Sequence, residues 1–407
     1  MNTLKPISNL DRIEFLDILR GMSIFFIFTA NIPFFSGLWF FDADSSIREI
    51  NWASDEVLRY IHYVLVDGKF YSIFSLLFGI GCVIQYNNAT SKGKSFAVFF
   101  RKRMFWLLVI GLIHLCLFWP GDILTLYALL GFVLVWFVDK SNKTLLVTAG
   151  ILLLFPIANL ALMYFAELPY PRLFFTLDVA VYQYFNMPII EVNGNEMPDF
   201  QAYLLNENIL DFFKMNLGNI FGRVGMILLE GRIFKVFGIF LIGIWTGRKI
   251  LNENLLTNKP FLKKVFWIGL ICGLPFNLLR GYLEFYAEDV ITTKFLHSTC
   301  YALGTVPLAL SIAAGIALFC INGSSFLRLF TSVGKTALTC YLVHTLTGII
   351  IFYGFGFQLA GKYGFSIVMI IAVLVFVAQV IISRIWLKYF EFGPMEWLWR
   401  KLVYGFK

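Results

Sequence analysis

The sequence has little charge. Only 14% of its 407 residues are Asp, Glu, Lys or Arg, whereas 59% are hydrophobic and the mean hydropathy is +0.77. A water-soluble globular chain carries about a quarter charged residues, so this composition excludes an ordinary soluble domain. The sequence therefore predicts a polytopic membrane protein.

The sequence also lacks the motifs of common metal and hydrolase sites. It has no Gly-x-Ser-x-Gly elbow, no His-Glu-x-x-His and no Cys-x-x-Cys pair. Its six cysteines are scattered through apolar stretches, which favours packing as small hydrophobic residues over disulfide or metal roles. We therefore expect no metal site and no tightly bound cofactor.

Long apolar runs are what the sequence does contain. Ten of them have about the length needed to cross the roughly 30 Å hydrocarbon core of a bilayer. They are continuous rather than alternating, so they predict helices and not barrel strands. The expected fold class is all-α, with one integral membrane domain over 1–407. The expected spans are 18–41, 61–86, 98–118, 122–138, 144–166, 233–252, 264–284, 299–321, 336–357 and 366–388.

Basic residues are distributed unevenly between the two sides of these spans. With the N-terminus inside, the inner segments hold 22 of the 33 Lys and Arg residues. Because short loops rich in Lys and Arg stay in the cytoplasm, we expect both termini there, with a cytoplasmic tail at 389–407. This topology and anionic lipid account for the net charge of +8, so no nucleic acid partner is expected.

One long connection, 167–232, joins the fifth and sixth spans on the expected outer side. It separates helices 1–5 (18–166) from helices 6–10 (233–388). A structureless loop of that length would be unusual, so we expect part of it to fold. Residues 201–217 place apolar side chains on one broad face, as an interfacial helix would. Such a helix either covers a cavity or is a connector without a ligand.

His114 and Asp122 bracket a tight turn between the third and fourth spans. So short a turn makes the two helices antiparallel neighbours, so both side chains can face one cavity. A His beside an Asp holds a defined tautomer and can move a proton near neutral pH. Two structural alternatives stay open: Asp122 as a helix cap, and His114 as a hydrogen-bonding residue between helices.

Three more charged residues lie at or within expected spans. Asp67 lies deep in the second span if 61–86 is one helix, where it needs a partner, and at a boundary if the helix starts near Phe70. Asp17 and Arg20 are three residues apart at the start of the first span, so they can pair with each other. The alternative is that they bind an anionic group.

Several motifs follow one another over nearly the whole chain. They are Arg12-Ile13 with Leu16-Asp17-x-x-Arg20-Gly21, Phe74-Ser75-x-Leu77-Phe78-Gly79-Ile80-Gly81, His114 followed by Gly121-Asp122-Ile123-Leu124-x-x-Tyr127-Ala128, the run from Gly334 to Leu342, and Gly393-Pro394-x-Glu396-Trp397-Leu398-Trp399-Arg400. Their order resembles the YeiB family of bacterial membrane proteins. The resemblance implies a multi-pass protein of the bacterial inner (plasma) membrane.

The chain is also distantly similar to transmembrane acyltransferases, namely the acyltransferase-3 proteins and the lysosomal enzyme that acetylates heparan sulfate glucosamine. They share an Asp-x-x-Arg-Gly start to the first helix. The acyltransferase-3 proteins carry a catalytic His near the outer end of the first span, where this chain has Asn31. His114 is the available base at comparable depth. His344 is a further departure, since the YeiB pattern would have Gln there.

This resemblance implies transfer of an acyl group from a cytoplasmic donor such as acyl-coenzyme A to an acceptor at the outer side. His114, oriented by Asp122, would be the base, and Asn31 would stabilise the oxyanion. Arg20 and the cluster of Arg101, Lys102 and Arg103 would attract the phosphates of the donor, and Asp17 would support Arg20. Taken alone, the cluster is better explained by the rule that basic residues stay on the cytoplasmic side.

A second function class uses the same region without covalent chemistry. In a transport protein, Asp67, His114 and Asp122 would form a relay for protons or a solute. In a membrane scaffold they would only join helices by hydrogen bonds. The identity of the acceptor, the acyl group and the number of chains in an assembly stay open.

Overall fold

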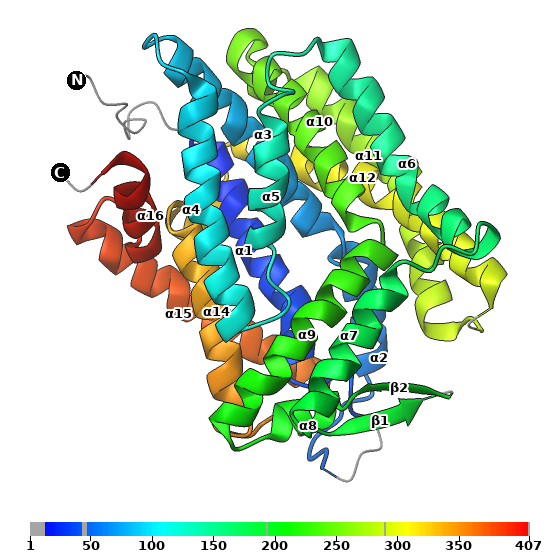
Figure 1. Ribbon diagram of the computed structural model, residues 1–407. Helices are drawn as coiled ribbons and strands as arrows, with labels where there is room; N and C mark the ends of the chain where they lie inside the picture. The colour runs from blue at the N-terminus through cyan, green and yellow to red at the C-terminus, as the bar shows by residue number, and fades with distance from the viewer. Residues whose placement is uncertain (1–12, 43–46, 193, 289, 406–407) are drawn as a thin grey trace.

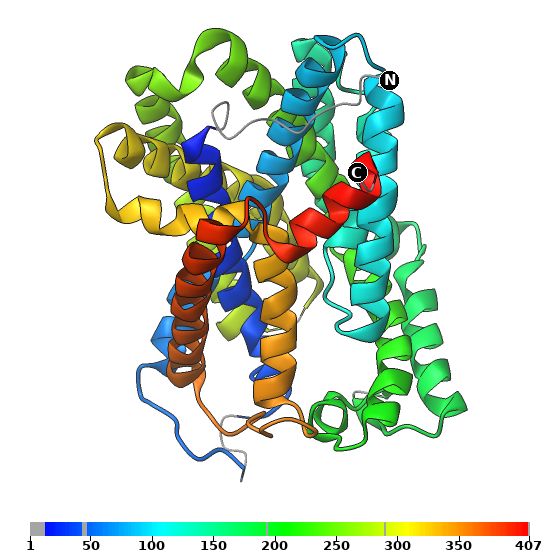
Figure 2. The same cartoon turned by 90° about the vertical axis from the view of Figure 1, so that its left-hand side faces the viewer.

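The computed structural model describes residues 13–42, 47–192, 194–288 and 290–405. Within these ranges the chain forms a bundle of helices with one two-stranded hairpin (Figures 1 and 2). Arg12 of the first motif lies outside the described residues. The described part is thus almost entirely helical, in agreement with the all-α class.

The α-helices in chain order are α1 (Glu14–Phe35), α2 (Asp55–Leu65), α3 (Lys69–Thr90), α4 (Phe96–Leu117), α5 (Leu124–Leu134), α6 (Asn142–Phe165), α7 (Pro171–Tyr184), α8 (Phe200–Leu205), α9 (Ile209–Leu229), α10 (Arg232–Glu253), α11 (Lys259–Tyr286), α12 (Ile291–Ile321), α13 (Thr331–Lys335), α14 (Ala337–Phe352), α15 (Phe365–Tyr389) and α16 (Pro394–Tyr404). Strands β1 (Ile189–Val192) and β2 (Asn195–Pro198) form an antiparallel hairpin. Two 3₁₀ turns cover Leu255–Thr257 and Phe326–Phe330.

In the described part of the chain, six segments are long and apolar enough to cross a membrane, and a seventh qualifies if a bent pair counts as one span. The bent pair, Phe326–Lys335 with Ala337–Phe352, turns by 86°. The expected ten spans all coincide with helices, but α4, α5 and α10 do not qualify by themselves. α5 has only 11 residues, and α4 and α10 each carry several charges. A helical membrane protein is supported, while ten spans and the side of the termini stay predictions.

Helices α6, α11 and α15 turn large apolar side chains outward. Ile151, Ile271 and Leu374 are 64%, 68% and 63% exposed. Apolar surface on this scale is unfavourable in water and favourable in hydrocarbon. The outer faces of these helices are therefore suited to contact lipid.

The connection 167–232 is folded, as expected, into α7, the hairpin, α8 and α9. The expectation of one helix over 201–217 is wrong, because α8 ends at Leu205 and α9 begins at Ile209. The Asn208 side chain accepts a hydrogen bond of 2.9 Å from the backbone N–H of Leu210 and so starts a new helix. α9 then runs to Leu229 and packs along α7 (Figure 1).

Three helices begin inside the bundle. α3 starts after a turn at residues 66–68, α10 after Gly231, and α14 after Thr336. The residues at these starts are buried, with Lys69 and Lys235 0% exposed and Thr336 2% exposed. Helix starts expose unpaired backbone N–H groups. Each of these three starts therefore brings backbone hydrogen-bond donors into the interior of the bundle.

Candidate functional site

A buried histidine lies between a carboxylate and a hydroxyl where α4, α5 and α14 meet. His114 Nδ1 is 2.8 Å from Asp122 Oδ1, and His114 Nε2 is 2.9 Å from Thr345 Oγ1. Only 2% of His114 and 3% of Asp122 is exposed. A carboxylate at Nδ1 keeps the proton on that nitrogen, which leaves Nε2 as the basic position of the neutral ring. The ring can then take a proton from a hydroxyl at the place that Thr345 occupies.

Asp122 combines the two roles that the sequence left open. Its Oδ1 faces His114, and its Oδ2 accepts a hydrogen bond of 2.7 Å from the backbone N–H of Thr125 in the first turn of α5. One carboxylate therefore caps α5 and orients the imidazole. Because both oxygens are engaged, the side chain is held in one position and holds His114 in turn.

α9 fixes the end of α4 that carries His114. Asn216 donates hydrogen bonds to the carbonyls of Leu115 and Cys116 at 3.1 and 2.8 Å, and its own oxygen accepts one from Tyr203. These carbonyls belong to the last turn of α4, where they have no partner within the helix. Asn216 thus caps α4 directly after His114.

Aromatic rings enclose His114 and Asp122. The rings of Tyr341 and Trp119 lie 5.3 and 6.4 Å from that of His114. The Tyr341 hydroxyl also accepts a hydrogen bond of 3.3 Å from the backbone N–H of Ile123. Such surroundings exclude water, and hydrogen bonds are stronger in a medium of low dielectric constant.

Asn31 lies near this region without touching it. It is half-buried on α1, between Phe34 and Phe35 around the helix, and both of those rings pack against Trp119. The described residues include no hydrogen bond between its amide and His114 or Asp122. A role for Asn31 as an oxyanion donor stays a prediction.

Asp67 belongs to a second polar cluster. It lies in the turn between α2 and α3, so the alternative in which the helix begins near Phe70 is the one that the structure has. Asp67 Oδ1 lies 2.8 Å from Nη2 of Arg280 on α11. Arg280 is therefore the charged partner of this carboxylate. The structure does not bring Asp67 into contact with His114 or Asp122.

Arg223 on α9 lies between the two polar regions. Its guanidinium interacts electrostatically with Asp122 and Tyr341 beside His114. It also interacts with Glu230 and Arg232 at the start of α10, which pair with each other at 2.5 Å. Charged groups therefore extend from His114 toward the junction of α3 and α10.

The predicted donor-binding residues fall into two groups. Arg20 Nη1 lies 2.6 Å from Asp17 Oδ1, so the expected pair forms. Arg103 lies 3.8 Å over the ring of Trp399 on α16 and interacts electrostatically with Arg20. Arg101 is exposed and points away, because residues two apart on a helix differ by about 200°. Arg20 and Arg103 share one region, and Arg101 does not.

Sequence reasoning missed three residues that belong to these polar clusters, namely Arg280, Lys235 and Thr345. Arg280 and Lys235 are ionisable residues inside the predicted spans 264–284 and 233–252, and that depth was the signal that could have found them. Thr345 carries no such signal. Its contact with His114 joins residues 231 positions apart and depends on how α14 packs against α4.

The thiols and acidic groups give no sign of a metal centre. Within the described ranges, no three His, Cys, Asp or Glu side chains are placed to hold a metal ion. All six cysteines are free. The side chains that the structure brings together here supply a base, His114, and several cationic groups that can bind an anion.

Comparisons with known proteins support the family resemblance of the motifs. The chain is 25% identical to the uncharacterised protein YeiB of Escherichia coli (strain K12), over 95% of both chains. It is 28% identical to the uncharacterised protein YxaH of Bacillus subtilis (strain 168), over 99% of this chain and 97% of YxaH. Residues 246–406 match a family described as protein of unknown function (DUF418). The resemblance to YeiB-like proteins is confirmed. These YeiB-like relatives are uncharacterised, so a function has to be argued from the site.

Proposed function

We propose that this membrane protein transfers an acyl group from a thioester donor, such as acyl-coenzyme A, to a hydroxyl or amine acceptor. The observation that carries the proposal is the buried arrangement of Asp122, His114 and Thr345. An acceptor takes the place of Thr345 at Nε2 and attacks the thioester carbonyl while its proton passes to Nε2. The thiolate leaves and takes that proton, and Asp122 stabilises the charged imidazole in between.

The region of Arg20 and Arg103 suits the phosphates of the donor. Guanidinium groups bind phosphate in a bidentate manner, and these two lie close enough to interact electrostatically. Arg103 and His114 lie on the same helix, about 16 Å apart along its axis. A donor extended along α4 would bring its thioester toward His114, with Asn31 as the proposed oxyanion donor. The proposal includes cytoplasmic termini and an acceptor from the opposite side.

The test is release of free thiol from acetyl-coenzyme A by purified protein in lipid vesicles, with a set of soluble amines and alcohols as acceptors. His114→Gln should lower the rate at least about 100-fold. His62→Gln is the matched control, because His62 Nε2 also lies 3.0 Å from a threonine hydroxyl, that of Thr29. No described carboxylate pairs with His62. Wild-type rates in folded His114→Gln protein would contradict the proposal.

A second candidate function is transport of a small solute, which is favoured by the starts of α3 and α10 inside the bundle. In transporters, helices that begin near the midplane direct their N-termini at anionic substrates. α3 and α10 begin in this way, at Lys69 and Arg232. Asp67 and His114 would then move protons with the solute, and no thiol would be released. Uptake into vesicles that consumes no acyl donor would separate this candidate from acyl transfer.

A further inference from the structure

Two buried lysines and an arginine come together where α3 and α10 begin. Lys69 and Lys235 are 0% exposed, and Arg280 is 6% exposed. Lys69 Nζ donates to two backbone carbonyls at 3.0 and 2.6 Å, and Lys235 Nζ donates to the carbonyl of Tyr301 at 2.9 Å. Over the ranges that the structure describes, neither ammonium group pairs with a carboxylate. These lysines have neutral acceptors only.

The charges of this cluster do not cancel. Asp67 pairs with Arg280, while the nearby Glu230 is engaged by Arg232. With both lysines protonated, two lysines and one arginine against one carboxylate leave two positive charges. A buried ammonium group without a counter-ion is strongly unfavourable. An anion of about two negative charges would compensate the cluster and keep both lysines protonated.

Two buried donors beside the lysines also have no partner. Arg280 Nη1 and Thr305 Oγ1 make no hydrogen bond within the described residues, and Thr305 is 0% exposed. They lie 3.6 and 3.8 Å from the position that a Cβ of Gly68 would take. Gly68 has a φ of +80°, which favours glycine, and it directly precedes the first residue of α3. Both donors therefore lie beside the start of that helix, where the methyl group of Thr305 makes the closest approach to Gly68, at 2.7 Å from the same Cβ position.

The helix starts add further donors. Neither α3 nor α10 has a side-chain cap at its N-terminus. The first N–H groups of a helix lack partners and carry partial positive charge, so they attract anions. Tyr71 in the first turn of α3 is hydrogen-bonded to Tyr301 of α12, and Lys235 in the first turn of α10 lies 3.0 Å from the centre of the Tyr301 ring. The two helix starts therefore meet at one tyrosine.

We propose that Lys69, Lys235, Arg280 and Thr305 form a binding site for a phosphate group, free or as a phosphomonoester. A phosphomonoester carries about two negative charges near neutral pH, which matches the two positive charges left over in the cluster. Its oxygens accept hydrogen bonds from the ammonium groups, from Arg280 Nη1 and from the Thr305 hydroxyl. The site does not depend on acyl transfer by His114 and can be tested without it.

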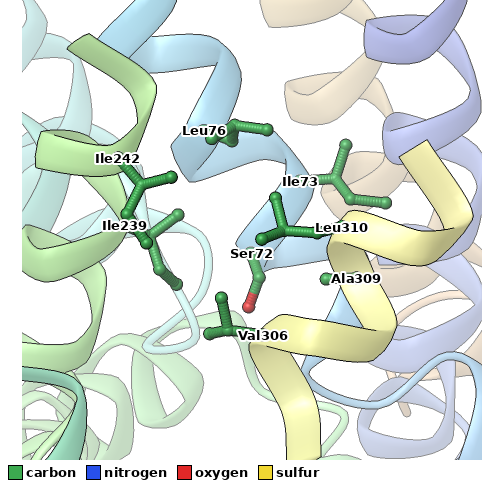
Figure 3. A pocket seen from close by; sticks show the side chains of 8 residues that line it. All are labelled: Ser72, Ile73, Leu76, Ile239, Ile242, Val306, Ala309 and Leu310. Carbon is green, nitrogen blue, oxygen red and sulfur yellow. The ribbon is translucent and has the colours of Figure 1, made fainter. Parts of the chain in front are cut away.

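The same three helices, α3, α10 and α12, also line a separate cavity of about 10 Å³, roughly the room of one water molecule (Figure 3). Its lining is apolar apart from Ser72 and includes none of the four residues of the proposed site, so this cavity is not the phosphate site. At the cluster itself, the Asp67 side chain is 41% exposed, while that of Arg280 is 8% exposed.

The experiment is thermal unfolding of the purified, detergent-solubilised protein during titration with inorganic phosphate, at an ionic strength kept constant with chloride. We expect a saturable rise of several degrees in Tm. Glycerol 3-phosphate and phosphatidic acid in mixed micelles are the parallel arms. A shift with the soluble phosphates identifies a soluble ligand, and a shift with phosphatidic acid alone identifies a lipid headgroup. If none of the three ligands raises the Tm more than chloride does, the proposal is overturned.

Two variants link the effect to the site. Lys235→Met and Thr305→Val should each raise the phosphate concentration at half-saturation at least tenfold. Lys249→Gln, at the exposed end of α10 where Lys249 pairs with Glu253, should keep the wild-type response. Lys235→Met also removes a buried amine that has no carboxylate partner, so its Tm without phosphate should exceed that of the wild type. An unchanged phosphate response in Lys235→Met and Thr305→Val would overturn the proposal.

Discussion

At the scale of single residues, the charge of Asp122 matters more than its shape. Asp122→Asn keeps the volume and can still accept the Thr125 N–H, but it loses the charge that stabilises a protonated His114. The amide can also select the wrong tautomer of the ring. We expect acyl transfer about 100- to 10,000-fold slower, measured as thiol release beside a Tm determination. A folded Asp122→Asn protein with near wild-type rates would contradict the orienting role.

Substitution of Thr345 tests whether this residue only occupies the acceptor position or is itself the nucleophile. In direct transfer the Thr345 hydroxyl only marks where the acceptor binds, so Thr345→Val should slow the reaction less than about tenfold. Mass spectrometry of the peptide that contains Thr345 should find no acyl adduct after mixing with donor. A loss as large as that of His114→Gln, with an adduct in the wild type, would mean that Thr345 itself is acylated.

Asp178 on α7 should make stability depend on pH. It is 3% exposed with Oδ1 unpartnered among the described residues, and burial raises the pKa of its carboxyl to about 7 from an ordinary value of 3.8. The folded protein therefore holds this proton more tightly than the unfolded chain. Its stabilising contribution is complete below about pH 4, falls as the pH rises to about 7, and amounts to a few kcal/mol.

The measurement is Tm between pH 5 and 8 for the wild type and Asp178→Asn. The wild-type Tm should fall over this range. The variant, which cannot ionise, should show a flatter curve and a higher Tm at pH 8. Parallel curves for the two proteins would contradict the assignment.

At the scale of helices, the break before α14 is stabilised by the C-terminal helix. Glu396 on α16 accepts hydrogen bonds from the backbone N–H groups of Leu338 and Thr339 at 2.6 and 3.2 Å, and from the Thr339 hydroxyl at 2.6 Å. A carboxylate at a helix N-terminus replaces the missing cap and complements the helix dipole.

Glu396→Ala should therefore destabilise the protein by about 1–2 kcal/mol, seen as a lower Tm. Glu391→Ala is the control, because Glu391 is exposed just before the same helix. Since α14 also carries Thr345, the Glu396 variant should lose activity as well. Equal Tm values for the two variants would show that the cap contributes nothing.

The helices themselves could be predicted from the sequence, but not all of their breaks. Apolar runs locate helices because length and composition alone decide what fits a bilayer. The start of α3 is one of the two alternatives that the sequence leaves open at Asp67, and the expected span 336–357 begins one residue before α14. The break between α8 and α9 was missed, because the apolar face of 201–217 continues through it. The pairing of His114 with Asp122 followed from their spacing around one turn. The partners Thr345 and Arg280 depend on packing between distant helices, which no local pattern encodes.

At the scale of the whole molecule, Lys and Arg residues favour the expected cytoplasmic side over the outer side. This difference is larger when buried residues are left out of the count. Of the 33 basic residues, 11 fall outside the segments expected to be cytoplasmic. Three of these, Lys69, Lys235 and Arg280, are buried and face neither solvent nor lipid headgroups. Only accessible loop charges orient a membrane protein, so these three residues do not count among the basic residues of the outer side. Leaving them out strengthens the prediction that the termini are cytoplasmic.

The number of crossings decides where the C-terminus lies. An even number, such as the predicted ten, places both termini on one side, whereas seven crossings would place them on opposite sides. We predict that a fluorescent protein that matures only in the cytoplasm will be active after Lys407, and that alkaline phosphatase fused there will be inactive. Activity of the phosphatase fusion would contradict ten crossings.

Six crossings would also put both termini on one side, so the pair of α4 and α5 needs its own test. These helices pack against each other and are joined by the short turn 118–123 (Figure 2). Leu117 at the end of α4 is 47% exposed. In a variant without the six native cysteines, Leu117→Cys should react with an impermeant maleimide added outside intact cells. If α4 and α5 do not cross, this cysteine stays unlabelled until the cells are opened, and the outer approach of an acceptor to His114 is lost with it.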